Sequence, residues 1–206
     1  MAVSKDNPLA LCRTFLFIPG ADEGAMLGAL DGDGDVLVQE LEDFTPPARR
    51  AEARVLAQHV LQRWREAGRI SAVRINPFET CGHEDLTAVM AARPQVVMMS
   101  KVQSRDEMIE LDRHITRLEA QHGIAPGTTL IVPNIETALG VVRAIEIAQA
   151  SPRIKAMLVA TEDMVADLGA GRSRAGTELF YPRSRFLLEC AAAGVLAIDS
   201  PYTFAD

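Results

Sequence analysis

The stretch "TTLIVPNIETALG", residues 128–140, contains an apolar run, then a carboxylate, and then apolar residues at helical spacing. Residues 129–132 have the length and composition of a short buried strand. Glu136 follows where this strand should meet a helix, and a charge at such a junction must be compensated because burying an unpaired ion is costly. The stretch therefore predicts a strand–helix junction that carries a paired or functional carboxylate.

Short apolar runs alternate with longer helical patterns along the whole chain. Strands are expected at residues 13–20, 35–43, 71–76, 95–102, 129–136, 155–163 and 195–199. Helices are expected at 46–68 and 104–123, and both segments end on glycine, a common helix stop. Strict alternation predicts parallel strands, as in a doubly wound sheet or a (β/α) barrel. Since no linker-like or low-complexity segment divides the chain, we expect one domain over residues 1–206.

Polar side chains follow nearly every expected strand. They are Glu40, Glu42, Asp43, Arg74, Asn76, Lys101, Glu136, Glu162, Asp163 and Asp199. In a barrel the carboxyl ends of all strands lie on the active-site face, whereas a doubly wound sheet concentrates functional residues at its switch point. The pattern therefore favours an α/β fold of the TIM (β/α)8 type. Seven strands are visible instead of eight, so the last β/α unit is expected to be missing.

The composition limits the classes of partner and the compartment. Lys and Arg total 21 against 28 Asp and Glu, which gives a net charge of -7 and no electrostatic footprint for nucleic acid or an anionic membrane. The first residues contain no continuous apolar signal region, and no stretch approaches the roughly 20 apolar residues of a membrane-spanning helix. Three cysteines without paired spacing indicate reduced thiols and a cytoplasmic location.

The charged residues at the strand ends suggest a metal site. Carboxylates on one rim repel each other unless a cation lies among them. Oxygen ligands without paired His or Cys favour Mg²⁺, and Glu136 and Asp163, at the ends of neighbouring strands, are the best pair. Arg74, inside an apolar strand, is expected to hold an anion such as a substrate carboxylate or an enolate oxygen. The alternatives are interactions with helix N-termini for the two carboxylates and a salt bridge for Arg74.

Three other segments are weaker candidates for ligand sites. "DGDGDVLVQELE" (31–42) resembles a calcium loop but has Val36 where that loop needs glycine, so an acidic turn is expected. "CGHED" (81–85) has no second ligand pair at zinc spacing and is expected to be a solvated loop. "GAGRSRAG" (169–176) is either a phosphate cradle or a mobile loop, and the mobile loop is favoured. The remaining histidines are expected to face solvent from helices: His59, His114 and His122.

Seven motifs in order resemble a known family. They are "RTFLFIPG", "ELEDFTPPARRAEAR", "VRIN", "SKVQS", "IVPNIETALG", "ATEDMVADLG" and "YPRSRFLLECAAAGVLAID", between Arg13 and about Tyr202. Together they are similar to the HpcH/HpaI aldolase–citrate lyase family, on its citrate lyase β-subunit-like side. The resemblance implies a Mg²⁺-dependent carbon–carbon lyase that cleaves a β-hydroxyacyl thioester, such as citryl-, citramalyl- or malyl-CoA, by a retro-Claisen-type step. It implies that Glu136 and Asp163 ligate the metal.

The same resemblance assigns the other site residues and the partners. It implies that Arg74 contacts the substrate in the catalytic site and that Glu42 organises the site or relays a proton. Lys101 and Arg13 are further substrate-binding candidates. The alternative role for Lys101 is to neutralise neighbouring carboxylates, and Arg13 starts its strand at the end opposite the active rim. The implied partners are an acyl-CoA or acyl-carrier thioester and further copies of the chain, in a trimer or hexamer.

The chain departs from the family pattern at several points. The family usually has Asp where Glu40 stands, Pro at Ser100 and Gly at Ala160, and its members continue beyond "DSPYTFAD" into an eighth strand and C-terminal helices. Two alternative functions therefore stay open. One is a class II pyruvate-type aldolase acting on a 4-hydroxy-2-oxoacid, although such enzymes generally carry a His near "QELEDFT", where this chain has none. The other is a non-catalytic barrel subunit.

Overall fold

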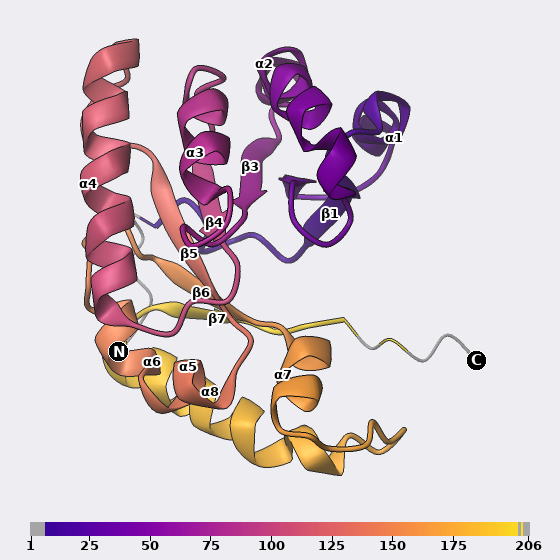
Figure 1. Cartoon of the computed structure of the whole chain (residues 1–206), viewed down its shortest axis with the longest axis vertical. Coiled ribbons are helices and arrows are strands. Elements are labelled where there is room, and N and C mark those ends of the chain that lie inside the picture. Colours follow the sequence, from indigo (N-terminus) through magenta and orange to yellow (C-terminus); the bar gives the residue numbers. More distant parts are fainter. Residues whose placement is uncertain (1–6, 202, 204–206) are drawn as a thin grey trace. The chain divides into compact units, whose positions relative to one another are not determined.

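The structure, a computed structural model, describes residues 7–201 and 203 (Figure 1). Within these residues there are seven strands: β1 (Phe15–Pro19), β2 (Val36–Glu40), β3 (Ile70–Ile75), β4 (Val96–Met99), β5 (Leu130–Ile135), β6 (Ala156–Val159) and β7 (Leu196–Ile198). Their order in the sheet follows the chain from β1 to β7. The pairs β1–β2, β2–β3, β3–β4, β5–β6 and β6–β7 are parallel. A doubly wound sheet would reverse the order at its switch point, so the sequential order confirms the predicted TIM-type fold with seven strands.

Helices connect the consecutive strands. They are α1 (Glu23–Gly28), α2 (Arg50–Glu66), α3 (Gly82–Met90), α4 (Arg105–His122), α5 (Ala138–Val142), α6 (Ala144–Ala148), α7 (Thr161–Asp167) and α8 (Phe180–Ala193), with 3-10 turns η1 (Ala29–Asp31), η2 (Pro47–Arg49) and η3 (Thr177–Leu179). The predicted helices over 46–68 and 104–123 are confirmed. The strand expected over 155–163 is shorter than predicted, because α7 already begins at Thr161. Among the described residues, no helix combines the length and the apolarity needed to cross a membrane.

The contacts divide the chain into two compact units. The N-terminal unit comprises residues 11–100 and 112–131, and the C-terminal unit comprises the described residues of 1–10, 101–111 and 132–206. In the N-terminal unit, β2 is buried along its whole length, and α2 and α3 pack against β3 (Figure 1). Trp64 of α2 is fully buried, and its indole Nε1 donates to the carbonyl of Met26 in α1 at 2.8 Å. This bond fixes α2 against α1.

In the C-terminal unit, α8 packs on β6 and β7 and contacts α5 and α6 (Figure 1). The β6 strand is buried throughout. Just beyond β7, the Ser200 hydroxyl donates to the carbonyl of Val159 and accepts from the amide of Thr161 at 3.0 Å. The chain after β7 therefore fixes the junction between β6 and α7. The expectation of a single domain over residues 1–206 stays a prediction.

Candidate active site

In the N-terminal unit, Arg74 of β3 lies beside Glu40 of β2. The strand register pairs their Cα positions, and residues paired in this way present their side chains to the same face of a sheet. The guanidinium Nε donates to Glu40 Oε1 at 2.9 Å, and both side chains are buried. Burying a charge is tolerated only when it is paired and hydrogen-bonded, and this pair satisfies that condition.

Glu40 is held by the backbone that follows its own strand. Its Oε1 accepts from the amide of Glu42 at 2.6 Å, and its Oε2 accepts from the amide of Phe44 at 2.5 Å. Together with the Arg74 guanidinium, these two amides give the buried carboxylate three hydrogen-bond donors. Glu40 therefore fixes both the turn after β2 and the direction in which Arg74 extends.

Two further carboxylates and two aromatic rings surround the Arg74 guanidinium. Its Nη2 lies 3.3 Å from Glu42 Oε2 and 3.3 Å from Asp43 Oδ2. The rings of Phe17 and Phe44 lie 5.3 and 5.9 Å from the guanidinium carbon, within the range of cation–π attraction. The predicted catalytic pair Arg74 and Glu42 is thus brought into contact, and Glu42 is only 6% exposed.

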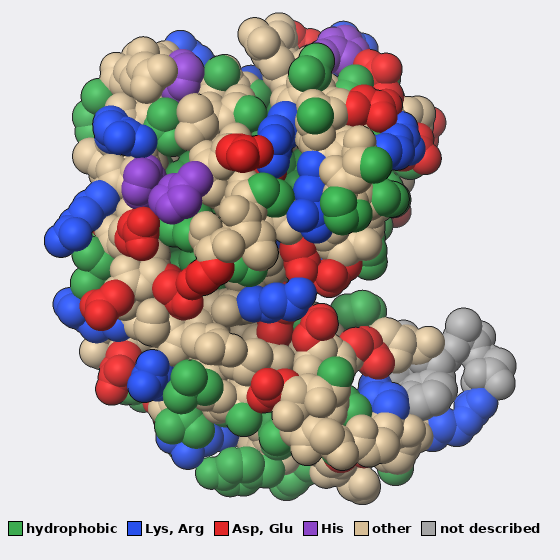
Figure 2. Space-filling model, in the orientation of Figure 1, with side chains coloured by type: hydrophobic (Ala, Val, Ile, Leu, Met, Phe, Trp, Pro, Cys, Tyr) green, Lys and Arg blue, Asp and Glu red, His purple; other side chains and the backbone are tan. Residues whose placement is uncertain are grey.

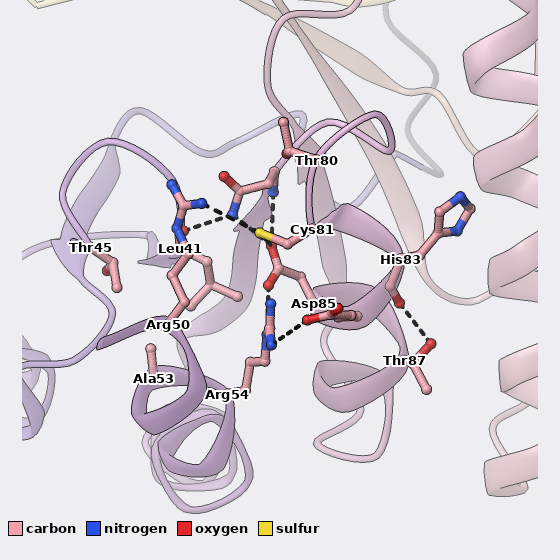
Figure 3. Close-up of polar contacts among 12 residues, drawn as sticks. Leu41, Thr45, Arg50, Ala53, Arg54, Thr80, Cys81, His83, Asp85 and Thr87 are labelled. Carbon is pink, nitrogen blue, oxygen red and sulfur yellow. Dashed lines mark hydrogen bonds and ion pairs between the residues drawn. The ribbon is translucent and has the colours of Figure 1, made fainter. Parts of the chain in front are cut away.

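A second network supports the end of β3. Asp85 of α3 is fully buried, and its Oδ2 accepts from the amide and the side-chain Nδ2 of Asn76 at 3.0 and 2.7 Å. Its other oxygen accepts from Arg54 Nε of α2 at 2.8 Å (Figure 3). Asn76 also donates to the carbonyl of Leu41 at 2.8 Å. The segment that carries Arg74 is therefore linked to α2, α3 and the end of β2.

In the C-terminal unit, Glu136 directly follows β5 and is completely buried. Two residues earlier, Asn134 is also completely buried, and neither its Oδ1 nor its Nδ2 makes a hydrogen bond among the described residues. Positions 134 and 136 lie on the same side of an extended chain because side chains alternate. Since native proteins rarely leave buried polar atoms unsatisfied, this end of β5 is suited to a polar ligand.

The other predicted metal ligand, Asp163, lies in the first turn of α7 and is half-buried. The register pairs Ile135 of β5 with Val159 of β6, so Glu136 and the start of α7 both follow the carboxyl ends of adjacent strands. Carboxylates at this position match the oxygen donors that Mg²⁺ takes in proteins. The donor chemistry of Glu136 and Asp163 thus fits the predicted ion.

The neighbouring Glu162 has a different, structural set of partners. Its Oε1 accepts from the Thr203 hydroxyl at 2.8 Å and from Arg172 Nε at 3.0 Å, and these bonds lower the pKa of Glu162. Arg172 also contacts Glu178, whose pKa is lowered to about 2, chiefly by hydrogen bonds from Ser173. Two carboxylates thus compensate Arg172 in the "GAGRSRAG" loop, and this arrangement does not favour a phosphate cradle.

Lys101 and Arg13 occupy contrasting places. Lys101 follows β4, is exposed and has a positive φ of 56°, a strained backbone conformation that is uncommon outside glycine and clusters at functional sites. Arg13 precedes β1, and its side chain is 79% exposed and 3.6 Å from Asp35. The register places Arg74 level with Glu40 and Pro19, and Pro19 lies six residues after Arg13. At about 3.3 Å per residue, Arg13 therefore lies roughly 20 Å along the strand direction from the level of Arg74. The structure therefore does not bring Arg13 and Arg74 together, and the substrate roles of Arg13 and Lys101 stay predictions.

The C-terminal unit also contains a groove of about 390 Å³ between α8 and the end of β7. Its lining is mostly apolar and includes Phe180, Phe186, Leu187 and Ile198. Its main charged pair is Arg183 with Asp199, which bind each other. Neither Glu136 nor Asp163 lines the groove, so it is separate from the candidate metal ligands.

Comparison with known proteins identifies the family. The model of the HpcH/HpaI aldolase/citrate lyase family matches residues 13–206. This chain belongs to that family. The chain is 33% identical over 195 residues to citrate lyase subunit beta of Escherichia coli (strain K12), covering 94% of this chain and 65% of that protein.

Two further comparisons each cover more than nine tenths of this chain. The chain is 29% identical over 191 residues to the (3S)-malyl-CoA thioesterase of Cereibacter sphaeroides (strain ATCC 17025), covering 92% of this chain and 63% of that protein. The crystal structure of RipC from Yersinia pestis is 26% identical, with a TM-score of 0.75, and the match covers 95% of this chain and 78% of that one. The chain thus spans about two thirds of the length of the curated relatives, and it shares the fold of the RipC structure.

Two side chains that are prominent in the structure, Glu40 and Asn134, had no specific role predicted from the sequence. Glu40 is the carboxylate with the shortest ion pair to Arg74, at 2.9 Å against 3.3 Å for Glu42 and Asp43. The sequence did contain a signal for this ion pair, because Glu40 and Arg74 both lie near the carboxyl ends of consecutive strands. Asn134 lies two positions before Glu136, and only its burial without hydrogen-bonding partners among the described residues distinguishes it.

Proposed function

We propose that this chain is a Mg²⁺-dependent carbon–carbon lyase that cleaves a β-hydroxyacyl thioester of the citryl-, citramalyl- or malyl-CoA type. In this proposal Glu136 and Asp163 hold the metal, and Arg74 and Glu42 act on the substrate. The observation that carries the proposal is the buried, strand-end carboxylate of Glu136 beside the unsatisfied amide of Asn134. Family membership supports the reaction class, and the CoA thioester in the name of the malyl-CoA relative supports the substrate class.

The chemistry divides between the metal and the protein side chains. When bound, Mg²⁺ supplies a template and Lewis-acid polarisation for substrate oxygens. Glu42 takes the proton from the substrate hydroxyl. The carbon–carbon bond then breaks, its electron pair passes to the thioester fragment as an enolate, and the other fragment becomes an oxo acid. Arg74 stabilises negative charge that develops on oxygen.

The environment of Arg74 suits this role because its direction is fixed before any substrate binds. Glu40 holds Nε, the two aromatic rings lie against the guanidinium, and the Asp85 network supports the adjacent Asn76. A charge that is already oriented needs no reorganisation when negative charge develops, which is the basis of electrostatic catalysis. Lys101 and Arg13 are proposed as further contacts to the anionic parts of the substrate.

The test is a Mg²⁺ titration of the purified chain with citramalyl-, malyl- and citryl-CoA, with free 4-hydroxy-2-oxoacids as controls. Oxo-acid release and thiol release are followed separately. We expect metal-dependent oxo-acid release from one thioester. Glu136→Gln and Asp163→Asn should abolish turnover and weaken Mg²⁺ binding at least about 10- to 100-fold, the range seen when even residues that only support a metal ligand are lost.

Glu162→Gln is the matched control, since this carboxylate lies next to Asp163 but is paired with Arg172 and Thr203. It should leave Mg²⁺ affinity within about twofold of wild type, a difference of about 0.4 kcal/mol. Full activity in Glu136→Gln would contradict the assignment of Glu136 as a Mg²⁺ ligand. Cleavage of the free oxoacids alone would indicate the aldolase, thiol release without oxo acid would indicate a thioesterase, and Mg²⁺ binding without turnover would indicate a non-catalytic subunit.

A further inference from the structure

Asn134 is the only residue of the buried strand β5 that has a polar side chain. The strand reads LIVPNI, and all its residues are buried. Asparagine is depleted in β-strands, and a departure from local preference of this kind is expected chiefly at functional or strained sites. Asn134 is completely buried, and its Oδ1 and Nδ2 make no hydrogen bond with the residues that the structure describes. Both atoms are therefore available to a ligand.

The backbone around Asn134 is, in contrast, held by hydrogen bonds within the C-terminal unit. The Asn134 carbonyl accepts from the amide of Val102 at 3.1 Å, and the carbonyl of Ile135 accepts from the amide of Ala160 at 2.9 Å. The register places Asn134 beside Leu158 of β6, whose apolar side chain offers no hydrogen bond. The side-chain amide is thus carried by a fixed strand, and groups on such elements are positioned more precisely than groups on loops.

The spacing between Asn134 and Glu136 limits the size of the ligand. Two residues along an extended chain separate their Cα atoms by about 6.6 Å, and both side chains lie on the same side of the chain. A ligand of a few carbon atoms that is held at Glu136 therefore reaches the amide of Asn134.

The overall charge of the protein gives it no general attraction for anions. The chain carries a net charge of -7, and acidic and basic side chains are interspersed over the face drawn in Figure 2. A negative protein repels an anion at long range. An anionic ligand at Asn134 must therefore be held by local groups, which are Nδ2 of the amide and, in the proposed function, Mg²⁺.

We propose that Asn134 binds the hydroxyl and the carboxylate of an α-hydroxycarboxylate group, the part of the β-hydroxyacyl thioester that carries the carbon–carbon bond to be broken. Oδ1 accepts from the hydroxyl, and Nδ2 donates to the carboxylate. A metal ion alone would satisfy only Oδ1, and a carboxylate alone would satisfy only Nδ2. The α-hydroxycarboxylate presents a donor and an acceptor on adjacent carbon atoms, so it satisfies both.

This inference rests on the proposed function for the identity of the thioester, and it names the residue that selects the hydroxyl group. The hydrogen bond to Oδ1 orients the substrate before cleavage and is released when the base of the proposed reaction takes the hydroxyl proton. Asn134 is thus a substrate-binding residue, and its loss should act on KM more than on kcat, because the interaction is already made in the ground state.

The test is calorimetric titration of the full chain, in saturating Mg²⁺, with free acids that differ only in the hydroxyl: malate against succinate and citramalate against methylsuccinate. These acids contain no thioester, so the measurement needs no turnover. We expect wild type to bind each hydroxy acid at least about tenfold more tightly than its partner, or about 1.4 kcal/mol. Asn134→Leu, which has nearly the same shape, should lower this ratio at least about fivefold, or about 1 kcal/mol.

The thermal midpoint of the ligand-free protein separates this role from a structural one. Asn134→Leu should raise the midpoint, because it removes buried polar atoms that have no partner among the described residues and so carry a desolvation cost. Asn134→Ala has a smaller side chain that cannot clash, and it should lose the same hydroxyl preference. A lower midpoint in Asn134→Leu together with an unchanged hydroxyl preference in both variants would overturn the proposal.

Val132→Ala is the matched control. Val132 is completely buried and lies two residues before Asn134, on the same side of β5. Shortening it leaves a cavity, so the midpoint should fall, while the hydroxyl preference should stay as in wild type. A loss of the preference in Val132→Ala as large as in Asn134→Leu would show that packing, and not the amide, sets the preference.

The outcomes also separate this inference from the proposed function. If wild type cleaves a thioester and Asn134→Leu keeps the same KM, the role of Asn134 is overturned and the lyase stands. If no thioester is cleaved but Asn134→Leu removes a hydroxyl preference of wild type, the lyase is contradicted and the inference stands. Equal binding of hydroxy and deoxy acids by wild type, or binding of neither, would overturn the inference.

Discussion

At the scale of the residue, Glu40 is the side chain on which the Arg74 cluster depends. It is fully buried and accepts from Arg74 and from two backbone amides. Glu40→Ala would leave a buried guanidinium without its shortest ion pair and two amides without an acceptor. We expect a loss of about 3–5 kcal/mol in the free energy of unfolding, the usual cost of removing one partner of a buried pair. Urea denaturation of both proteins measures it.

The control for this prediction is Glu40→Asp, which keeps the charge and shortens the side chain by one methylene group. Because Asp keeps the negative charge beside Arg74 and only lengthens the hydrogen bonds, we expect a loss of only about 1 kcal/mol, comparable to one weakened hydrogen bond. Equal losses in both variants would show that side-chain length, and not the charge beside Arg74, sets the stability of the cluster.

The residue scale also shows how far the sequence could define the site. The apolar context of Arg74 and of Glu136 predicted that both charges need compensation, and both are buried. The sequence offers three carboxylates at positions 40, 42 and 43, and only the strand register selects Glu40 as the neighbour of Arg74. The rings of His83 and His114 lie 4.8 Å apart, and this contact could not be predicted because β4 separates the two residues in the chain.

At the scale of the element, the start of α3 is built around a glycine. A Cβ at Gly82 would lie 2.2 Å from the carbonyl oxygen of Asn76 and 2.8 Å from that of Pro77. Both atoms belong to the backbone, so they cannot rotate away. Gly82→Ala should therefore displace the first turn of α3, which holds Asp85 and His83, and lower stability by about 1–3 kcal/mol, the typical cost of overpacking. Thermal unfolding measures the loss.

Gly28→Ala is the matched control for this element. Gly28 ends α1 with helical backbone angles, and a Cβ there would meet nothing within 4 Å. The substitution should therefore leave stability unchanged or raise it by about 0.5–1 kcal/mol, since alanine loses less conformational freedom in a helix than glycine. A destabilisation as large as that of Gly82→Ala would show that close approach is not the cause.

The elements themselves were largely predictable because their signals are local. Apolar runs of strand length predicted all seven strands. The two longest helices end at Glu66 and His122, just before Gly68 and Gly123, which have positive φ angles of 75° and 61°. The error at the end of β6 has a local cause as well. The apolar run of β6 is followed directly by Thr161, Glu162 and Asp163, which resemble the end of a strand. Acidic residues also stabilise the first turn of a helix, and α7 begins at Thr161.

At the scale of the whole molecule, the proposed Mg²⁺ site and the single tryptophan lie in different units. Glu136 and Asp163 belong to the C-terminal unit, and Trp64 is buried in the N-terminal unit. Trp64 fluorescence therefore reports the unfolding of one unit, while a ligand binds the other. If residues 1–206 form one cooperative domain, as the sequence predicts, both units unfold together. Mg²⁺ binding to the C-terminal unit must then raise the midpoint of the unfolding transition that Trp64 fluorescence follows in the N-terminal unit.

The size of this effect follows from linkage. Mg²⁺ at 100 times its dissociation constant should add about 2.7 kcal/mol to the free energy of unfolding. For a chain of this length that corresponds to about 5–10 °C in the midpoint of the Trp64 transition. Circular dichroism should shift equally, and Glu136→Gln should remove both shifts. A Trp64 midpoint that does not move while part of the dichroism transition does would contradict the single domain, because the two units would then unfold independently.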